Sequence, residues 1–209
     1  MALTKREFLL ALPVAALMAQ AFPRQVAAAG SVGQVSRLAG TVTIVRNGMD
    51  TAAAIGAEVL VDDQIRSGAD SRAEITFSDG SILTVGPESD ISVSYFAPEE
   101  AESNAVLDLF SGIARLTVNK ATGWGRFEVR TATAVASVRG TDYLVEATAG
   151  KSAVFVAEGR VAVSSRAGAG TVILREGQGV DIPAEKAPLV VKRWGAKRRD
   201  EALARVTFS

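Results

Sequence analysis

The stretch that decides the fold is Ala73-Glu74-Ile75-Thr76-Phe77-Ser78-Asp79-Gly80-Ser81-Ile82-Leu83. Its first five residues alternate between apolar and polar side chains, which is the period of a strand with one buried face. An acidic residue followed by glycine separates this segment from a second apolar run, and such a pair is a strong hairpin signal. The stretch therefore predicts two antiparallel strands joined by a tight turn at Asp79-Gly80.

The same pattern recurs on both sides of this hairpin. Residues 91–95 and 127–130 alternate in the same way, and further turn signals stand at Asn47-Gly48, Glu158-Gly159 and Glu176-Gly177. No segment before residue 184 has the period of an amphipathic helix. We predict an all-β fold, a single antiparallel sandwich or jelly-roll-like domain of about a dozen short strands.

Three alternating segments begin with a glycine, at Gly40, Gly112 and Gly159. A solenoid would need a constant interval between them, and the two intervals differ. We therefore interpret the recurrence as one type of hairpin used repeatedly within a single domain.

The composition excludes several classes of chemistry. The chain has 209 residues, with 23 Lys and Arg, 23 Asp and Glu, and neither cysteine nor histidine. Disulfides, thiolate nucleophiles, the commonest metal ligand and the usual general base near neutral pH are therefore missing. The balanced charge speaks against a nucleic-acid partner. We predict a non-enzymatic protein with no catalytic, cofactor-binding or metal-binding residues and no cofactor.

Residues 1–29 have the features of a signal peptide. Lys5 and Arg6 precede an apolar run at residues 8–19, which is shorter than the roughly 20 residues of a membrane span. Three alanines then precede Gly30, and we predict cleavage after Ala29, with an uncleaved short anchor as the alternative. The start resembles a twin-arginine signal with lysine in place of the first arginine, so the export route stays open. The mature protein is expected to be periplasmic or secreted, with no stable membrane span.

The remaining chain divides into a β domain at residues 30–185 and a basic tail at residues 186–209. The segment 192–199 holds five basic residues, and the residues after it are compatible with a short helix. Three interpretations of the tail are open: a solvated segment, attraction to anionic envelope polymers or lipids, and a docking peptide anchored by Trp194.

The order of these segments resembles the FecR domain family, the ferric-citrate-regulator type of periplasmic sensor domain. The resemblance covers about residues 40–182, and Asp62 and Ser67 stand where the family has Gly and Thr. The matching pieces are residues 62–75 (G-D-x-I-x-T-G-x-x-S-x-A-x-I), 77–83 (F-x-D-G-S-x-L), 127–131 (F-x-V-x-T), 138–145 (V-R-G-T-x-F-x-V) and 154–163 (V-x-V-x-E-G-x-V-x-V).

The resemblance implies an interaction module of envelope sensing or signalling. In full-length FecR-type regulators a cytoplasmic anti-sigma region and a membrane span precede the domain. Here only seven residues precede Phe8, and the chain stops soon after the domain. We therefore expect a stand-alone exported module whose partner is an envelope protein or glycan. The partner's identity and the oligomeric state stay open.

Seven residues are candidate interaction or signature turn positions: Asp79, Gly80, Trp124, Arg139, Gly140, Thr141 and Trp194. We expect the glycines at 80 and 140 to adopt positive φ or to allow a close backbone approach. The side chains at 79 and 141 are expected to bond to backbone amides in their turns.

Arg139 and Trp124 each leave two interpretations open. Arg139 is expected to pin a loop by reaching Asp142 or Glu146, or else to contact a ligand. Trp124 lies between two glycines and is either a buried plug or a binding platform.

A carbohydrate-active enzyme with paired carboxylates is the alternative function. Asp62-Asp63 and the loop carboxylates Glu99, Glu100 and Glu102 are its candidate groups, with solvated surface charge as the simpler interpretation. Only the separation of two carboxyl groups in space decides between these interpretations.

Overall fold

The computed structural model describes residues 30–99 and 103–208, and the predicted signal peptide at residues 1–29 lies outside them. The described part holds seventeen strands, one 3-10 helix and one α-helix. The all-β prediction with a short C-terminal helix is confirmed. There are more strands than the predicted dozen, because several are only two to four residues long. Within these ranges neither helix has the length and apolar character of a membrane span.

In chain order the elements are β1 (Gly33–Ala39), β2 (Val42–Arg46), β3 (Met49–Ala52), β4 (Glu58–Val59), β5 (Gln64–Ser67), β6 (Arg72–Phe77), β7 (Ile82–Val85), β8 (Asp90–Ala97), β9 (Asn104–Thr117), η1 (Lys120–Thr122), β10 (Arg126–Arg130), β11 (Ala134–Val138), β12 (Asp142–Ala147), β13 (Lys151–Glu158), β14 (Arg160–Ser165), β15 (Thr171–Arg175), β16 (Gln178–Pro183), β17 (Lys192–Arg193) and α1 (Ala196–Arg205).

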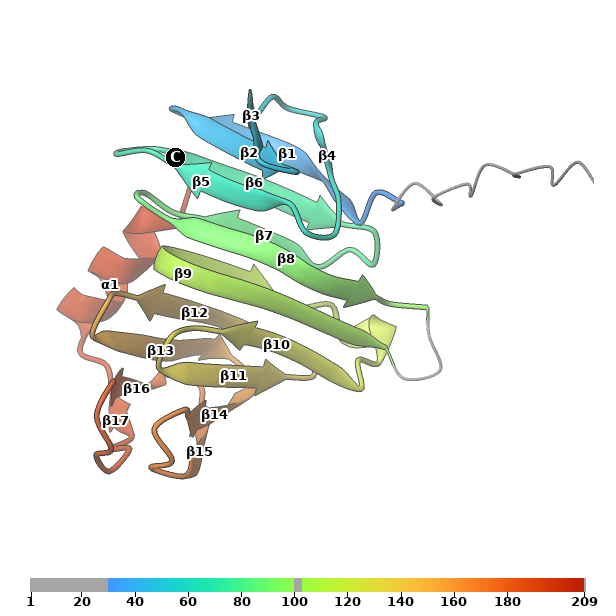
Figure 1. Ribbon diagram of the computed structural model, residues 1–209. Helices are drawn as coiled ribbons and strands as arrows, with labels where there is room; N and C mark the ends of the chain where they lie inside the picture. The colour runs from blue at the N-terminus through green and yellow to red at the C-terminus, as the bar shows by residue number, and fades with distance from the viewer. Residues whose placement is uncertain (1–29, 100–102, 209) are drawn as a thin grey trace, which may run out of the picture.

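The strands form two sheets that share one strand. The first sheet has the order β4-β1-β6-β7-β9-β12-β13-β16-β17. The second has the order β3-β2-β5-β8-β9-β10-β11-β14-β15. All of these pairings are antiparallel except β9 with β10, which is parallel. The N-terminal strands lie at one end of the stack and the C-terminal strands at the other, with β9 between them (Figure 1).

The main core lies between the two sheets. In β6 the apolar residues Ala73, Ile75 and Phe77 are buried while the residues between them are partly exposed, as the alternation predicts. The core cluster also contains Ile65 and Val163 from the second sheet. Burial of apolar side chains from both layers is the main stabilising contribution to such a sandwich.

The long strand β9 changes sheets at Gly112. Before it, Ser111 pairs with Asp90 of the second sheet, and after it, Ile113 pairs with Glu146 of the first sheet. Gly112 has a φ of 90°, and an added Cβ would lie 2.6 Å from the Cβ of Ser89 and closer still to its Cα. The Ser89 hydroxyl accepts a hydrogen bond from the Ile113 amide at 2.8 Å, which holds the corner closed.

Gly40 and Gly159 occupy similar corners. The chain leaves the first sheet for the second at each of them, between β1 and β2 and between β13 and β14. A neighbouring hydroxyl bonds to the next residue's backbone in both places: Ser71 Oγ accepts from the Thr41 amide, and Thr141 Oγ1 donates to the Arg160 carbonyl. The interpretation of these glycines as repeated hairpins was therefore wrong, because they mark passages between sheets.

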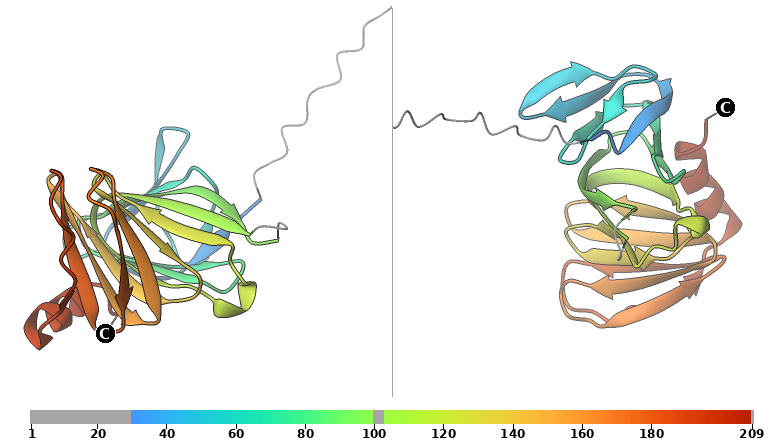
Figure 2. Two further views of the ribbon diagram at one scale, coloured as in Figure 1. Left: turned by 90° about the horizontal axis from the view of Figure 1, so that it is seen from below. Right: turned by 90° about the vertical axis from the view of Figure 1, so that its right-hand side faces the viewer.

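The C-terminal segment packs on the outer face of the first sheet. Trp194 is 8% exposed and its ring stacks on Phe155 at a centroid distance of 4.9 Å. Ala202 and Val206 join the same apolar cluster, and α1 lies beside the sheets (Figures 1 and 2). Trp194 therefore anchors the tail to the chain's own sheet.

Asp62 has a backbone conformation that favours glycine, with a φ of 68°. A non-glycine residue in this region costs roughly 1–2 kcal/mol, and aspartate tolerates it better than most residues. We expect Asp62→Gly to raise the free energy of unfolding by about 0.5–1 kcal/mol, measured by urea denaturation. Asp62→Ala, the control, should lower it. A destabilised Asp62→Gly variant would contradict the assignment.

Candidate functional site

The side chain of Asp79 joins the β6–β7 hairpin to the segment around η1. Its carboxylate accepts hydrogen bonds from the Ser81 amide at 2.9 Å and the Ser81 hydroxyl at 2.7 Å. The Thr122 hydroxyl and the Trp124 indole N–H also donate to it, each at 3.0 Å. Gly80 completes the turn with a φ of 83°. Asp79 thus makes the expected bond within its turn and also connects two segments that are distant in the chain.

Trp124 is buried in an aromatic cluster and is only 2% exposed. Phe96 and Phe127 meet its ring edge-on at centroid distances of 5.4 Å and 5.2 Å, and Phe77 stacks on Phe96 at 4.7 Å. Such contacts add to the stabilisation from burial. Together with Asp79, Trp124 forms a structural junction, and its indole offers no exposed platform.

Arg139 does not reach the predicted carboxylates. Asp142 pairs with Arg115 at 2.6 Å, and Glu146 pairs with Arg205 at 2.7 Å. Both carboxylates lie on β12 of the first sheet, whereas Arg139 follows β11 of the second sheet. Between Arg139 and Asp142 the chain passes from the second sheet to the first, so the side chain of Arg139 lies apart from both carboxylates. Arg139 is exposed and makes no ion pair among the residues that the structure describes.

Gly140 and Thr141 form the passage from β11 to β12. Gly140 has a φ of 118°, and an added Cβ would lie 3.0 Å from the Cα of Lys120, so the glycine allows a close approach. Thr141 is 3% exposed, and its hydroxyl donates to the carbonyl of Arg160 at 3.0 Å. The expected bond to a turn amide is thus replaced by a bond to β14.

A groove of about 710 Å³ opens beside this passage, where β10 and β14 begin and β11 and β15 end. We call it the arginine groove. Its lining holds no acidic side chain. The basic residues that line it are Lys120, Arg126, Arg139, Arg160 and Arg175.

Four of these residues form a row across adjacent strands, which we call the arginine row. Arg160 lies directly opposite Arg175 in the β14–β15 pairing. The last paired residues are Ser137 with Ala162 and Phe127 with Val138. When these registers are extended along the chain, Arg139 lies beside Arg160 and Arg126 lies beside Arg139. The order across the second sheet is therefore Arg126, Arg139, Arg160 and Arg175. All four residues are exposed, while their strand neighbours are buried.

Two of the basic residues that line the groove lie beside an acidic side chain. Lys120 donates to Glu158 at 2.7 Å, and this bond holds the pKa of Glu158 below its usual range. Arg126 lies 3.7 Å from Glu128.

The other three members, Arg139, Arg160 and Arg175, make no ion pair within the described ranges 30–99 and 103–208. Like charges directly opposite each other in a sheet are destabilising, typically by about 0.2–1 kcal/mol. Three of the four arginines of the row thus form an unneutralised positive surface.

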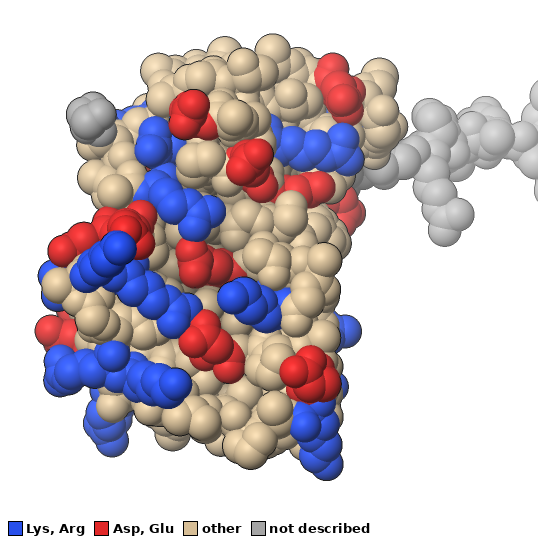
Figure 3. Space-filling model, turned by 90° about the vertical axis from the view of Figure 1, so that its left-hand side faces the viewer, with Lys and Arg blue, Asp and Glu red and all other residues tan. Residues whose placement is uncertain are grey.

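The face that carries α1 shows the opposite arrangement. Basic and acidic side chains alternate over it (Figure 3). Arg198 bonds to Asp181, which lowers the pKa of Asp181, and Arg205 bonds to Glu146. Three basic residues of the tail, Arg198, Arg199 and Arg205, are therefore paired within the chain.

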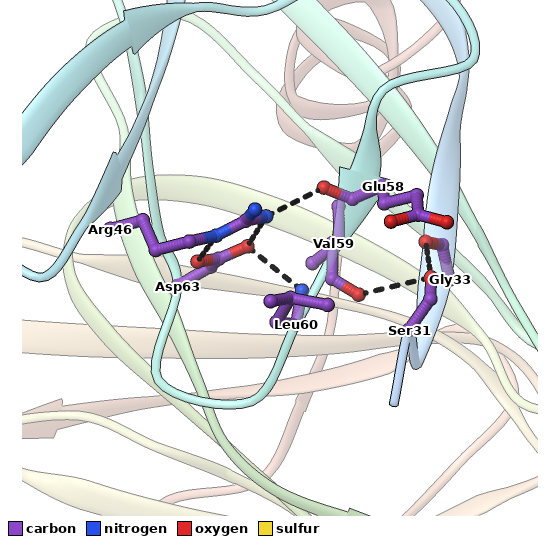
Figure 4. A network of polar contacts seen from close by, with 7 residues as sticks. All are labelled: Ser31, Gly33, Arg46, Glu58, Val59, Leu60 and Asp63. Atoms are coloured by element: carbon purple, nitrogen blue, oxygen red, sulfur yellow. Dashed lines mark hydrogen bonds and ion pairs between the residues drawn. The ribbon is translucent and has the colours of Figure 1, made fainter. Parts of the chain in front are cut away.

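The candidate carboxylates of a glycosidase pair are engaged elsewhere or exposed. Asp63 is fully buried and accepts bonds from Arg46 at 2.7 and 2.8 Å and from the Leu60 amide at 2.8 Å (Figure 4). Asp62 and Glu99 are exposed, and Glu100 and Glu102 lie outside the described residues. Over the described ranges, no group of three or more acidic side chains is placed to hold a metal ion.

The comparisons with known proteins agree with this architecture. Two crystal structures of a proposed anti-sigma factor from Parabacteroides distasonis align with a TM-score of 0.56 and 20% identity. The alignments cover 67% of this chain and 63% and 64% of those chains, so this chain spans less than two thirds of that protein. At this identity the likeness concerns the fold alone. A comparison with curated proteins gave no match.

One family model, described as FecR protein, matches residues 63–162. The matched region contains the Asp79 junction and three members of the arginine row. Residues 63–162 are therefore a FecR domain.

Proposed function

We propose that the chain is an exported, non-enzymatic interaction module of an envelope sensing or signalling system. In this proposal residues 1–29 direct export and the mature chain begins at Gly30. Residues 30–185 form the binding domain, and residues 186–209 are a tail packed against it. The partner is an envelope protein or glycan.

The observation that carries the proposal is the arginine groove. Its basic side chains include three arginines without an acidic partner among the described residues, and no carboxylate lines it. A surface of this kind favours binding of an anionic partner, since arginine forms bidentate bonds with carboxylates and phosphates. Acid–base hydrolysis of a glycan needs two free carboxyl groups across a cleft, and this groove offers none. The match of residues 63–162 to the FecR family model supports a sensing role.

A photo-crosslinking amino acid placed at Ala162 tests the proposal in cells. Ala162 lines the groove and is partly exposed. Thr76, on β6 of the first sheet, is a control with similar exposure. We expect an adduct of higher mass from position 162 in the envelope fraction, absent from position 76 and lost when Arg139 and Arg160 become glutamate. Equal labelling from both positions, or none from 162, would contradict the proposal.

Two further readouts test export and the absence of activity. The extracytoplasmic chain should begin at or near Gly30 by N-terminal sequencing, and an intact Met1 would overturn the export claim. The purified chain should leave envelope polysaccharides unchanged. Polysaccharide turnover that is lost on a single Asp or Glu→Ala change would favour the carbohydrate-active alternative instead.

A further inference from the structure

We propose that the arginine row binds a linear anionic glycan laid across strands β10, β11, β14 and β15, with one acidic group meeting one guanidinium per strand. This inference rests on the proposed function and names the chemical class of the partner.

The spacing of the row fits a polymer with a repeating charge. Arg126, Arg160 and Arg175 lie at the ends of β10, β14 and β15, and Arg139 directly follows β11, which lies between β10 and β14 in the second sheet. Neighbouring strands lie about 4.8 Å apart, so the four residues repeat at this interval along a line that crosses the strands. An extended ligand along that line meets a guanidinium at every strand.

The charge of the row is available to such a ligand. Arg139, Arg160 and Arg175 have no acidic partner among the described residues, and no acidic side chain lines the groove. Opposed like charges, as in the pair of Arg160 with Arg175, repel each other until an anion lies between them. Each guanidinium is a planar fork that matches a carboxylate or a phosphate with two hydrogen bonds.

The lining of the groove favours a glycan over a protein. Tight protein interfaces depend on a few aromatic or aliphatic anchors held in desolvated pockets. Between the basic residues, the lining consists of three glycines, Ser137, Thr141, Ala162, Val138 and Ile173, with no aromatic ring, and Ile173 is 62% exposed. A row of cations over a lining without an aromatic anchor favours a hydroxylated polymer that carries one acid per repeat.

Equilibrium binding of the purified full chain to defined polymers tests the inference. The probes are polygalacturonate, which carries carboxylates, phosphomannan, which carries phosphates, neutral dextran and poly-glutamate. We expect at least one of the two acidic polymers to bind at low salt and dextran not to bind. The stronger of the two identifies the acidic group. Because ion release drives such contacts, affinity should fall as salt rises.

Charge variants locate the site. Arg160→Glu with Arg175→Glu should weaken binding at least tenfold, while Arg160→Lys with Arg175→Lys, which keeps the charge and removes the fork, should weaken it several-fold. The matched control is Arg166→Glu with Lys186→Glu, an equal change of charge at two other exposed residues. It should stay within twofold of the parent. Circular dichroism and thermal unfolding confirm that each variant is folded.

Three results would overturn the inference: no binding of either acidic polymer, equal losses in the row and control variants, or tighter binding of poly-glutamate than of both acidic polymers. These results are distinguishable from failure of the proposed function. A row-dependent protein adduct from position 162, without binding of the polymers, would leave the module intact and reject the glycan. Absence of both signals would reject both proposals.

Discussion

Replacing Trp124 with alanine is expected to lower the free energy of unfolding by about 4 kcal/mol, because large aromatic-to-alanine changes in cores cost roughly 3–5 kcal/mol. Trp124 is 2% exposed and is packed edge-on against Phe96 and Phe127. The change also removes the indole N–H that donates to the Asp79 carboxylate, which then keeps only its bonds from Ser81 and Thr122. Urea denaturation with an unchanged m-value measures the loss.

Trp124→Phe is the matched control for this prediction. It keeps an aromatic ring in the cluster and removes the N–H donor, so we expect a smaller loss of about 1–2 kcal/mol. A loss below 1 kcal/mol for Trp124→Ala would contradict the buried junction.

Gly112→Ala is expected to destabilise the fold by about 3 kcal/mol or more. Alanine at a φ of 90° is strained, which costs roughly 1–2 kcal/mol. Its methyl group would also overlap Ser89, and overpacking typically adds about 1–3 kcal/mol. Thermal and urea unfolding measure the total effect. A full chain that fails to fold at all would agree with the same cause.

Gly48→Ala separates the two contributions. Gly48 has a similar φ of 76°, but no atom lies within 4 Å of an added Cβ. It should therefore show the backbone strain alone, about 1–2 kcal/mol. Equal losses of unfolding free energy at positions 48 and 112 would contradict this account. They would mean that the side chain of Ser89 moves aside without cost and that the corner in β9 is not tightly packed.

The alternation of residues predicted most of the architecture. Ala73, Ile75 and Phe77 face the core, and Asp79-Gly80 forms the expected turn. The passages between sheets were not predicted, because a glycine at the start of an alternating segment is equally typical of a hairpin. The sequence marks Gly112 as such a start, but it does not show that this glycine lies inside the fourteen residues of β9, where the strand changes partners.

The arginine row escaped prediction for a different reason. The sequence does show four arginines, each next to an apolar residue near the end of a strand. They are Arg126, Arg139, Arg160 and Arg175. Which strands become neighbours depends on pairing across the whole sheet, including the parallel pairing of β9 with β10. A local pattern carries no information about such pairing.

The contacts of Arg139 and Trp194 also depend on how distant strands pair, which the sequence does not show. Asp142 and Glu146 are near Arg139 in the chain, but the passage at Gly140 places them on the other sheet. Trp194 lies in a strongly basic segment for which the sequence left open a solvated segment, an attraction to anionic polymers or lipids, and a docking peptide. Its partner, Phe155, lies almost forty residues earlier, on the outer face of β13.

Chemical-shift mapping of the amide signals, during titration with an oligosaccharide of the acidic polymer that binds, locates the binding surface on the fold. We expect the perturbed signals to cluster in β10, β11, β14, β15 and the turn at Gly140, with little change on the face that carries α1. Perturbations that centre on α1 and β17, or that spread evenly over the surface, would contradict the assignment of the arginine row as the binding surface.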